Sequence, residues 1–208
     1  MTEINNDFEA ETNIKPVVII DYGAGNIMSI KFAIQRLGFE AWLTSNEEEI
    51  RNADKVIFPG VGEASSAMRM LISTGLDKVI PTLTQPVLGI CLGMQLMCRS
   101  SEEGNTPGLG IFDAEVIKFN GVLKVPQIGW NHIYDLESAL FEGVKERDYV
   151  YLVHSYYVPE CSGTIASTEY GVEYSTAIKK GNFYGVQFHP EKSSTAGEKI
   201  LANFLSKT

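Results

Sequence analysis

The sequence predicts an α/β fold, with a central and mostly parallel β-sheet, helices on both faces and an antiparallel extension in the second half. Three observations point to this fold. Short, continuous apolar runs, which are typical of strands buried on both faces, recur in the first half of the chain. Helical patterns separate these runs at intervals of about 10–15 residues, as in βαβ units. From Gly108 onwards short β-rich runs dominate, separated by Gly, Asn and Pro.

The ordered chain is predicted to begin at Pro16 with alternating strands and helices. The predicted strands cover residues 17–20, 41–44, 55–58 and the apolar run that ends just before Cys91. The predicted helices cover residues 27–37, 46–52, 63–73, 75–83 and 92–99. Gly38 ends the first helix, because glycine accepts the left-handed conformation that often follows a helix. Parallel strands present their carboxyl-end loops at one edge, so residues 23–26, 59–62 and the turn at Cys91 should lie together.

The second half of the chain completes the predicted domain. Residues 108–177 are expected to form the antiparallel extension, followed by a last strand over 181–189 and an amphipathic helix over 195–206. No stretch has the composition of an interdomain linker, so residues 16–208 are predicted to form a single domain. Residues 1–15 are polar, with four acids against one lysine, and are predicted to be a mobile N-terminal tail.

Composition excludes several classes of function. The net charge of −9 argues against nucleic acid or an anionic membrane surface as the main partner. No apolar run approaches the roughly 20 residues of a membrane span, and the N-terminus lacks the apolar core of a signal peptide. The three cysteines are odd in number and include no C-x-x-C pair, so neither a disulfide framework nor a metal site is expected. We therefore predict a cytoplasmic protein without a cofactor.

The segment 86–95 predicts a nucleophile elbow, a tight turn between a buried strand and a helix that exposes one reactive side chain. Cys91 has Gly89 and Gly93 two residues away on either side, and such a turn brings backbone segments too close for a Cβ. Free N–H groups and the helix dipole at this position favour the thiolate. On its own, the pattern fits a buried structural cysteine equally well. Cys98, seven residues later on the same predicted helical face, is interpreted as core packing.

His189 is the candidate base for such a nucleophile. It follows an apolar strand pattern and precedes Pro190 and Glu191. In extended backbone, residues i and i+2 point to one face, so Glu191 could accept a hydrogen bond from the imidazole, and Pro190 is expected to keep the backbone extended. His154 lies in an apolar and aromatic run that suits a structural histidine, and His132 has no acid at a useful spacing.

Acyl chemistry also needs hydrogen-bond donors for a developing oxyanion. The backbone N–H of Leu92, directly after the cysteine, is one candidate. The loop 59–62 offers Gly60 and Val61, since glycines let backbone N–H groups reorient without a Cβ penalty. The alternative for this loop is an ordinary tight turn.

Six segments in chain order resemble the class I, triad-type glutamine amidotransferases. They lie at residues 21–26, 59–62, 89–95, 129–131, 151–157 and 187–192, and the resemblance covers essentially residues 17–207. It implies the flavodoxin-like fold of that family and hydrolysis of L-glutamine to glutamate and ammonia. In this mechanism Cys91 attacks the side-chain amide, His189 moves protons and Glu191 orients His189.

The resemblance also implies binding residues. By the family pattern Gly62, Gln95, Ser155 and Tyr156 would line the glutamine pocket, and Glu103, twelve residues after the nucleophile, would meet the substrate ammonium. An exposed acid is the alternative for Glu103.

A partner subunit is implied as well. The resemblance is strongest to glutaminase subunits that form a heterodimer with a separate (β/α)₈ cyclase subunit and pass ammonia to it. Asn26, Trp130 and Lys192 match positions at that docking face. The alternatives are that Asn26 is a turn residue, that Trp130 belongs to the core and that Lys192 is a solvated charge. Gln127 stands where the family usually has histidine, and glutamine cannot carry a titrating charge.

Three alternatives to this function remain open at the level of sequence. The first keeps the glutaminase and changes the ammonia acceptor, for example to an enzyme that modifies sugar nucleotides. The second is a stand-alone cysteine hydrolase or peptidase, which would be active without a partner. The third is a non-catalytic flavodoxin-like binding module, which the presence of Cys91, His189 and Glu191 together argues against.

Overall fold

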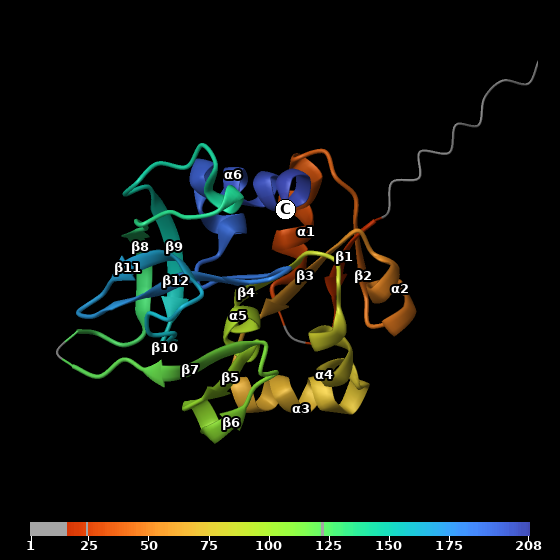
Figure 1. Cartoon of the computed structure of the whole chain (residues 1–208), viewed down its shortest axis with the longest axis horizontal. Coiled ribbons are helices and arrows are strands. Elements are labelled where there is room, and N and C mark those ends of the chain that lie inside the picture. Colours follow the sequence, from red (N-terminus) through yellow and green to blue (C-terminus); the bar gives the residue numbers. More distant parts are fainter. Residues whose placement is uncertain (1–15, 24, 122) are drawn as a thin grey trace, which may run out of the picture.

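A seven-stranded sheet forms the centre of the protein, with helices on both sides of it (Figure 1). The computed structural model describes residues 16–208 except Ala24 and Val122. The predicted tail, residues 1–15, lies outside the described residues. The strand order in the sheet is β11-β12-β13-β4-β3-β1-β2.

The parallel part of this sheet confirms the strands predicted in the first half of the chain, whereas the last strand, predicted over 181–189, covers only Phe183–Val186. It contains β1 (Val17–Ile20), β2 (Ala41–Thr44), β3 (Lys55–Gly60), β4 (Val87–Cys91) and β13 (Phe183–Val186). All pairings among them are parallel. Every residue of β1, β3, β4 and β13 is buried, which is why their sequences are continuous rather than alternating apolar runs.

The helices divide between the two faces of the sheet. They are α1 (Ile27–Arg36), α2 (Glu47–Asn52), α3 (Ala64–Thr74), α4 (Leu76–Val79), α5 (Leu92–Leu96) and α6 (Ser194–Lys207). Val17 and Ile19 of β1 pack with α1 and α6, whereas Val18 and Ile20 pack with α2, α3, α4 and α5. Successive strand residues point to opposite faces, so one short strand supports both layers of the core.

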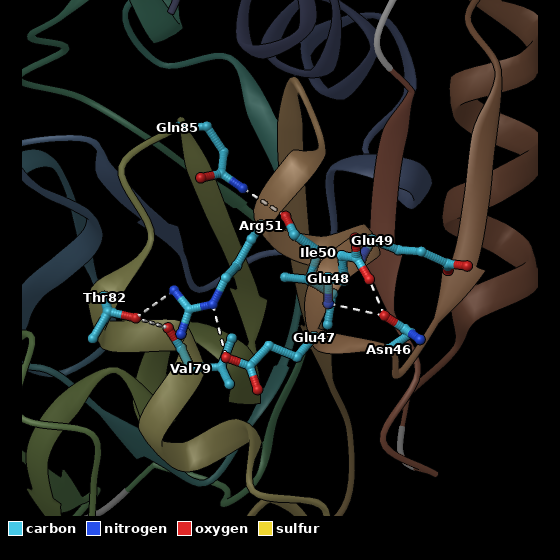
Figure 2. A network of polar contacts seen from close by, with 9 residues as sticks. All are labelled: Asn46, Glu47, Glu48, Glu49, Ile50, Arg51, Val79, Thr82 and Gln85. Carbon is cyan, nitrogen blue, oxygen red and sulfur yellow. Dashed lines mark hydrogen bonds and ion pairs between the residues drawn. The ribbon is translucent and has the colours of Figure 1, made fainter.

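Polar contacts cap α2 and tie it to the segment before β4. The side chain of Asn46 caps the helix by accepting hydrogen bonds from the backbone N–H groups of Glu48 and Glu49, at 2.8 and 3.2 Å (Figure 2). The Gln85 amide donates to the carbonyl oxygen of Ile50 at 2.6 Å, which ties α2 to the segment that leads into β4.

The second half supplies the predicted antiparallel extension. In the central sheet, β11 (Thr164–Glu169) and β12 (Glu173–Lys180) continue antiparallel from β13. The pair β8 (Gln127–His132) and β9 (Tyr149–His154) forms an antiparallel ribbon. A four-stranded sheet contains β5 (Cys98–Ser101), β6 (Thr106–Pro107), β7 (Phe112–Lys118) and β10 (Tyr156–Tyr157), with β5 and β7 parallel.

Short 3₁₀ turns connect several of these elements. They are η1 (Ile80–Thr82), η2 (Glu103–Asn105), η3 (Ala139–Phe141) and η4 (Pro190–Lys192). Among residues 16–208, apart from Ala24 and Val122, no helix combines the length and the apolar character needed to cross a membrane.

The helix predicted to run from residue 92 to 99 is wrong in its second half. It ends at Leu96, and Cys98 begins β5, which pairs with β6 and β7. Residues 92–98 are all buried, so the sequence has neither an exposed face nor a stop signal from which the end of the helix could be predicted. Cys98 is buried in the core as expected, but in a strand rather than on a helical face.

Candidate active site

Cys91 occupies a strained turn at the end of β4. Its backbone angles are φ 54° and ψ −111°, a combination that residues with a Cβ rarely adopt. The next residue begins α5, so the chain turns directly from a buried strand into a helix. This geometry matches the turn predicted for a nucleophile elbow, and backbone strain of this kind concentrates at functional sites.

Close contact between backbones explains the glycines around this turn. A Cβ on Gly93 would lie 2.0 Å from the carbonyl oxygen of Phe58, and one on Gly60 would lie 2.6 Å from the backbone nitrogen of Gly93. Both distances are far inside van der Waals contact, so only glycine fits at either position. The elbow and the end of β3 therefore pack backbone against backbone, and Gly60 lies opposite Cys91 in the sheet.

His189 and Glu191 form a buried pair beside Cys91. The distance from Nδ1 of His189 to Oε1 of Glu191 is 3.0 Å, and their side chains are 5% and 0% exposed. The expectation that Pro190 keeps this backbone extended is wrong, because Pro190 begins the 3₁₀ turn η4. Proline's fixed φ suits the first position of such a turn, and the turn brings Glu191 back onto the imidazole.

The environment of His189 favours its protonated form. Burial on its own lowers the pKa of His189, but hydrogen bonding to Cys91 and Glu191 and the negative charges of both outweigh burial and raise this pKa to about 10. His189 therefore carries a proton at neutral pH, next to a sulfur that benefits from a positive neighbour.

A cavity of about 240 Å³ opens onto this pair and gathers most of the predicted site residues. Cys91 and His189 line it together with Val61, Gly62, Leu92, Gln95, Glu103, Ser155 and Tyr156. Gly60 and Glu191 do not line the cavity themselves. Gly60 pairs with Cys91 in the sheet, and Glu191 contacts His189. Sequence reasoning missed four further lining residues, which are Pro126, Ile128, Val153 and His154.

Two of the predicted pocket residues already make hydrogen bonds within the protein. Nε2 of Gln95 donates to the carbonyl oxygen of Tyr156 at 2.9 Å. Oε2 of Glu103 accepts from the backbone N–H of Ala64 at 2.8 Å. Burial raises the pKa of Glu103, and the bond from Ala64 partly opposes this effect.

Gln187 is a site residue that the sequence reasoning did not single out. It is completely buried, and its Nε2 lies 3.7 Å from the sulfur of Cys91. Its position two residues before His189 was the available signal, since residues i and i+2 of a strand share a face.

Gln127 and His154 belong to a second buried group beside the pocket. They face each other across the β8–β9 ribbon, and the hydroxyl of Tyr174 lies 3.0 Å from Oε1 of Gln127 and 3.2 Å from Nε2 of His154. Nδ1 of His154 contacts the carbonyl oxygen of Tyr156 at 2.8 Å. Burial lowers the pKa of His154 to about 4, so it is neutral at pH 7.

The three residues predicted for a docking face lie at least partly at the surface. Trp130 is 52% exposed and packs edge-on against Tyr151, which excludes the core interpretation. Lys192 is exposed, while Asn26 is half-buried and accepts a hydrogen bond from the hydroxyl of Ser29 at 2.9 Å. Across residues 16–208, with Ala24 and Val122 left out, no group of three or more His, Cys, Asp or Glu side chains could hold a metal ion.

Comparisons with known proteins agree with this site. The family model "Glutamine amidotransferase class-I" matches residues 18–208. The imidazole glycerol phosphate synthase subunit HisH of Bacteroides thetaiotaomicron is 54% identical over 91% of this chain and 98% of the relative. The HisH subunit of Haemophilus influenzae is 46% identical over 92% of this chain and 97% of the relative.

Solved structures support the fold independently. One glutamine amidotransferase superposes with a TM-score of 0.71 at 19% identity, covering 90% of this chain and 96% of the other. Another, from Thermotoga maritima, gives a TM-score of 0.64 at 16% identity, covering 93% and 97%. The family match over residues 18–208 and the strained Cys91 elbow lead to one conclusion, that the chain belongs to the class-I glutamine amidotransferase family.

Proposed function

We propose that this chain is the glutamine-hydrolysing subunit of an imidazole glycerol phosphate synthase, acting in the cytoplasm in histidine biosynthesis. Residues 16–208 would act as one glutamine amidotransferase domain. The observation that carries the proposal is the contact of Cys91 with a buried His189–Glu191 pair at the wall of one cavity. HisH relatives at 46–54% identity favour this synthase over other ammonia acceptors.

The first chemical step uses the charges of the site. The sulfur of Cys91 attacks the side-chain amide carbon of glutamine, and the carbonyl oxygen becomes an oxyanion. The backbone N–H of Leu92 and those of the loop that carries Gly60 and Val61 are the donors we assign to this oxyanion. The C–N bond then breaks, and the nitrogen leaves as ammonia with the proton that His189 holds.

The second step returns the enzyme to its starting state. His189, now neutral, takes a proton from water, and the resulting hydroxide attacks the thioester carbonyl. The C–S bond breaks, glutamate leaves, and the sulfur of Cys91 again faces a protonated His189. Glu191 holds the imidazole by Nδ1 throughout, so Nε2 stays directed at the reacting atoms.

Substrate binding follows from the lining of the cavity. Gly62, Gln95, Ser155 and Tyr156 surround the space next to Cys91 where the glutamine side chain would lie. Glu103 has one carboxylate oxygen engaged by Ala64, and we assign its other oxygen to the substrate ammonium.

The outward face of the β8–β9 ribbon supports a docking site for the (β/α)₈ cyclase subunit in a heterodimer. This ribbon face consists of the cross-strand pairs Ile128–Val153, Trp130–Tyr151 and His132–Tyr149. Ile128, Trp130 and Tyr149 are each more than half exposed. Ile128 and Val153 also line the catalytic cavity, so a partner on this face would seal the cavity and receive the ammonia. Lys192, directly after Glu191, and Asn26 would add polar contacts at its rim.

Reconstitution with a cyclase subunit tests this function. The purified chain is mixed with the cyclase subunit of a HisH relative, and complex formation and imidazole glycerol phosphate synthesis from glutamine are measured. We expect a 1:1 complex that turns over, and weak glutaminase activity of the chain alone. Full glutaminase activity without a partner would support a stand-alone hydrolase instead. A glutaminase that neither binds the cyclase nor feeds it would point to another acceptor.

A further inference from the structure

A continuous line of hydrogen bonds leads from a backbone carbonyl to the sulfur of Cys91. Nε2 of Gln95 donates to the carbonyl oxygen of Tyr156 at 2.9 Å and to Oε1 of Gln187 at 2.8 Å. Nε2 of Gln187 then lies 3.7 Å from the Cys91 sulfur, within range of an N–H···S hydrogen bond. Gln95 is 5% exposed and Gln187 is fully buried, so neither amide has free access to water.

The chemistry of the groups fixes the orientation of both amides. A backbone carbonyl can only accept, so the Gln95 atom that faces Tyr156 must be the NH₂ group. The same NH₂ group contacts Gln187, so Gln187 must present its oxygen to Gln95. The NH₂ group of Gln187 has therefore no orientation left except toward Cys91. An amide flip, which ordinarily leaves such an assignment open, would here place two donors or two acceptors face to face.

We propose that Gln187 is a catalytic residue, an N–H donor to the sulfur of Cys91 that is held in place by Gln95 and the carbonyl of Tyr156. A donor in this position stabilises the sulfur when it is negatively charged, before attack and again as the thioester C–S bond breaks. An amide cannot take up a proton at neutral pH, so Gln187 leaves proton transfer to His189. The inference deepens the proposed function, because it rests on Cys91 being the nucleophile.

The charge of Cys91 acts on the pKa of two groups among the described residues, His189, which has Glu191 behind it, and Tyr22, whose hydroxyl donates to the carbonyl oxygen of Pro59 at 3.0 Å. Burial, followed by the charge of Cys91, raises the pKa of Tyr22, so this phenol stays neutral. Gln187 thus adds a neutral donor to the cationic His189 at this sulfur, and loss of its N–H should be visible in the reactivity of the sulfur.

Alkylation of Cys91 tests the assignment without glutamine or a partner. The full chain is treated with iodoacetamide across a pH series, and modification of Cys91 is followed by peptide mass spectrometry, which separates it from Cys98 and Cys161. Gln187→Glu keeps the shape and the acceptor for Gln95, removes the donor and adds a negative charge beside the sulfur. Gln187→Met removes the amide without adding charge. In Gln187→Met we expect the pH midpoint of alkylation to rise by about one unit, with alkylation roughly tenfold slower below the midpoint, and in Gln187→Glu the added charge should make the rise larger.

Gln85→Met is the matched control, since it removes a structural amide hydrogen bond to Ile50 (Figure 2). Gln85 precedes the first residue of β4, whereas Cys91 is the last residue of that strand. It should leave the alkylation profile unchanged. Folded Gln187 variants with a wild-type profile would overturn the proposal, whether or not they lose glutaminase activity. If the wild-type chain fails to hydrolyse glutamine while the Gln187 variants show the shifted alkylation profile, the proposed function is contradicted and the N–H···S contact is supported.

Discussion

Glu191 accepts a hydrogen bond from Nδ1 of His189 at 3.0 Å, and no other hydrogen-bond donor within the described residues reaches its second, buried oxygen. The carboxylate therefore has one partner, and its task is to hold that imidazole in a fixed orientation. A buried carboxylate with one partner would also stabilise the imidazolium that, in the proposed mechanism, donates its proton to the leaving nitrogen.

The Glu191→Gln variant tests that task. The amide retains the size of the side chain, but it loses the negative charge and can turn a donor toward Nδ1. We expect kcat for glutamine hydrolysis in the reconstituted complex to fall by about a hundredfold or more, with little change in thermal stability. Glu142→Gln, which removes an exposed carboxylate paired with Lys207, serves as control and should retain full activity. Activity of Glu191→Gln within a factor of about two of wild type would rule out an orienting role.

Trp130 should contribute strongly to cyclase binding. Replacing it with alanine removes a large exposed aromatic from the ribbon face, and we expect the complex to weaken by about 2 kcal/mol, roughly thirtyfold in Kd by titration calorimetry. Trp42 is a matched control, because it is 53% exposed and lies on β2 at the far edge of the central sheet. Equal effects of Trp130→Ala and Trp42→Ala would contradict the docking face.

Gly93 should be the most sensitive glycine of the elbow. A Cβ there would lie 2.0 Å from the carbonyl oxygen of Phe58, so Gly93→Ala must push β3 and α5 apart. We expect a loss of about 3 kcal/mol or more in the free energy of unfolding, measured by urea denaturation. Gly38→Ala is the comparison, since Gly38 has a positive φ of 84° but open space around it. Its cost should be only about 1 kcal/mol, and equal costs would contradict the packing argument.

Stability in mild acid should depend on His154. Its pKa is about 4 in the folded protein, below the ordinary value of 6.5, so its contribution to stability is complete above pH 6.5 and is lost as the pH falls toward 4. From pH 7 to 5 this amounts to a loss of about 2 kcal/mol. The pKa of His189 is raised instead, to about 10, so the contribution of His189 to stability is lost only as the pH rises toward 10. His189 therefore cannot cause a loss of stability between pH 7 and pH 5.

Urea denaturation of the wild type and of His154→Gln at both pH values isolates this effect. The variant does not titrate at residue 154, so its stability should fall less between pH 7 and pH 5 than that of the wild type. The same fall in both proteins would mean that His154 is not the group responsible.

Local patterns were sufficient to predict the parallel sheet and the elbow. The runs 17–20 and 41–44 match β1 and β2 residue for residue. β1 is buried on both faces and therefore has a continuous apolar sequence bounded by polar residues, whereas β2 is the edge strand and only Ala41 is buried in it. The glycines beside Cys91 were also informative, since the close approach that requires them is that of α5, the helix directly after Cys91, to the strands β3 and β4.

Long-range contacts decided what the sequence could not predict. α5 ends at Leu96 because Cys98 pairs with β7, a strand that follows only after η2 and β6. The amide of Gln187 is oriented by Gln95, which is 92 residues earlier in the chain. The turn that brings Glu191 onto His189 was missed because Pro190 is compatible with both extended and 3₁₀ backbone.

The Cys91→Ala variant in the reconstituted complex tests the central claim most directly. Imidazole glycerol phosphate synthesis is measured once with glutamine and once with added ammonium as the nitrogen source. If Cys91 is the nucleophile that supplies ammonia to the cyclase, the glutamine-dependent rate should vanish while the ammonium-dependent rate is retained. A complex that still uses glutamine after Cys91→Ala would contradict this account.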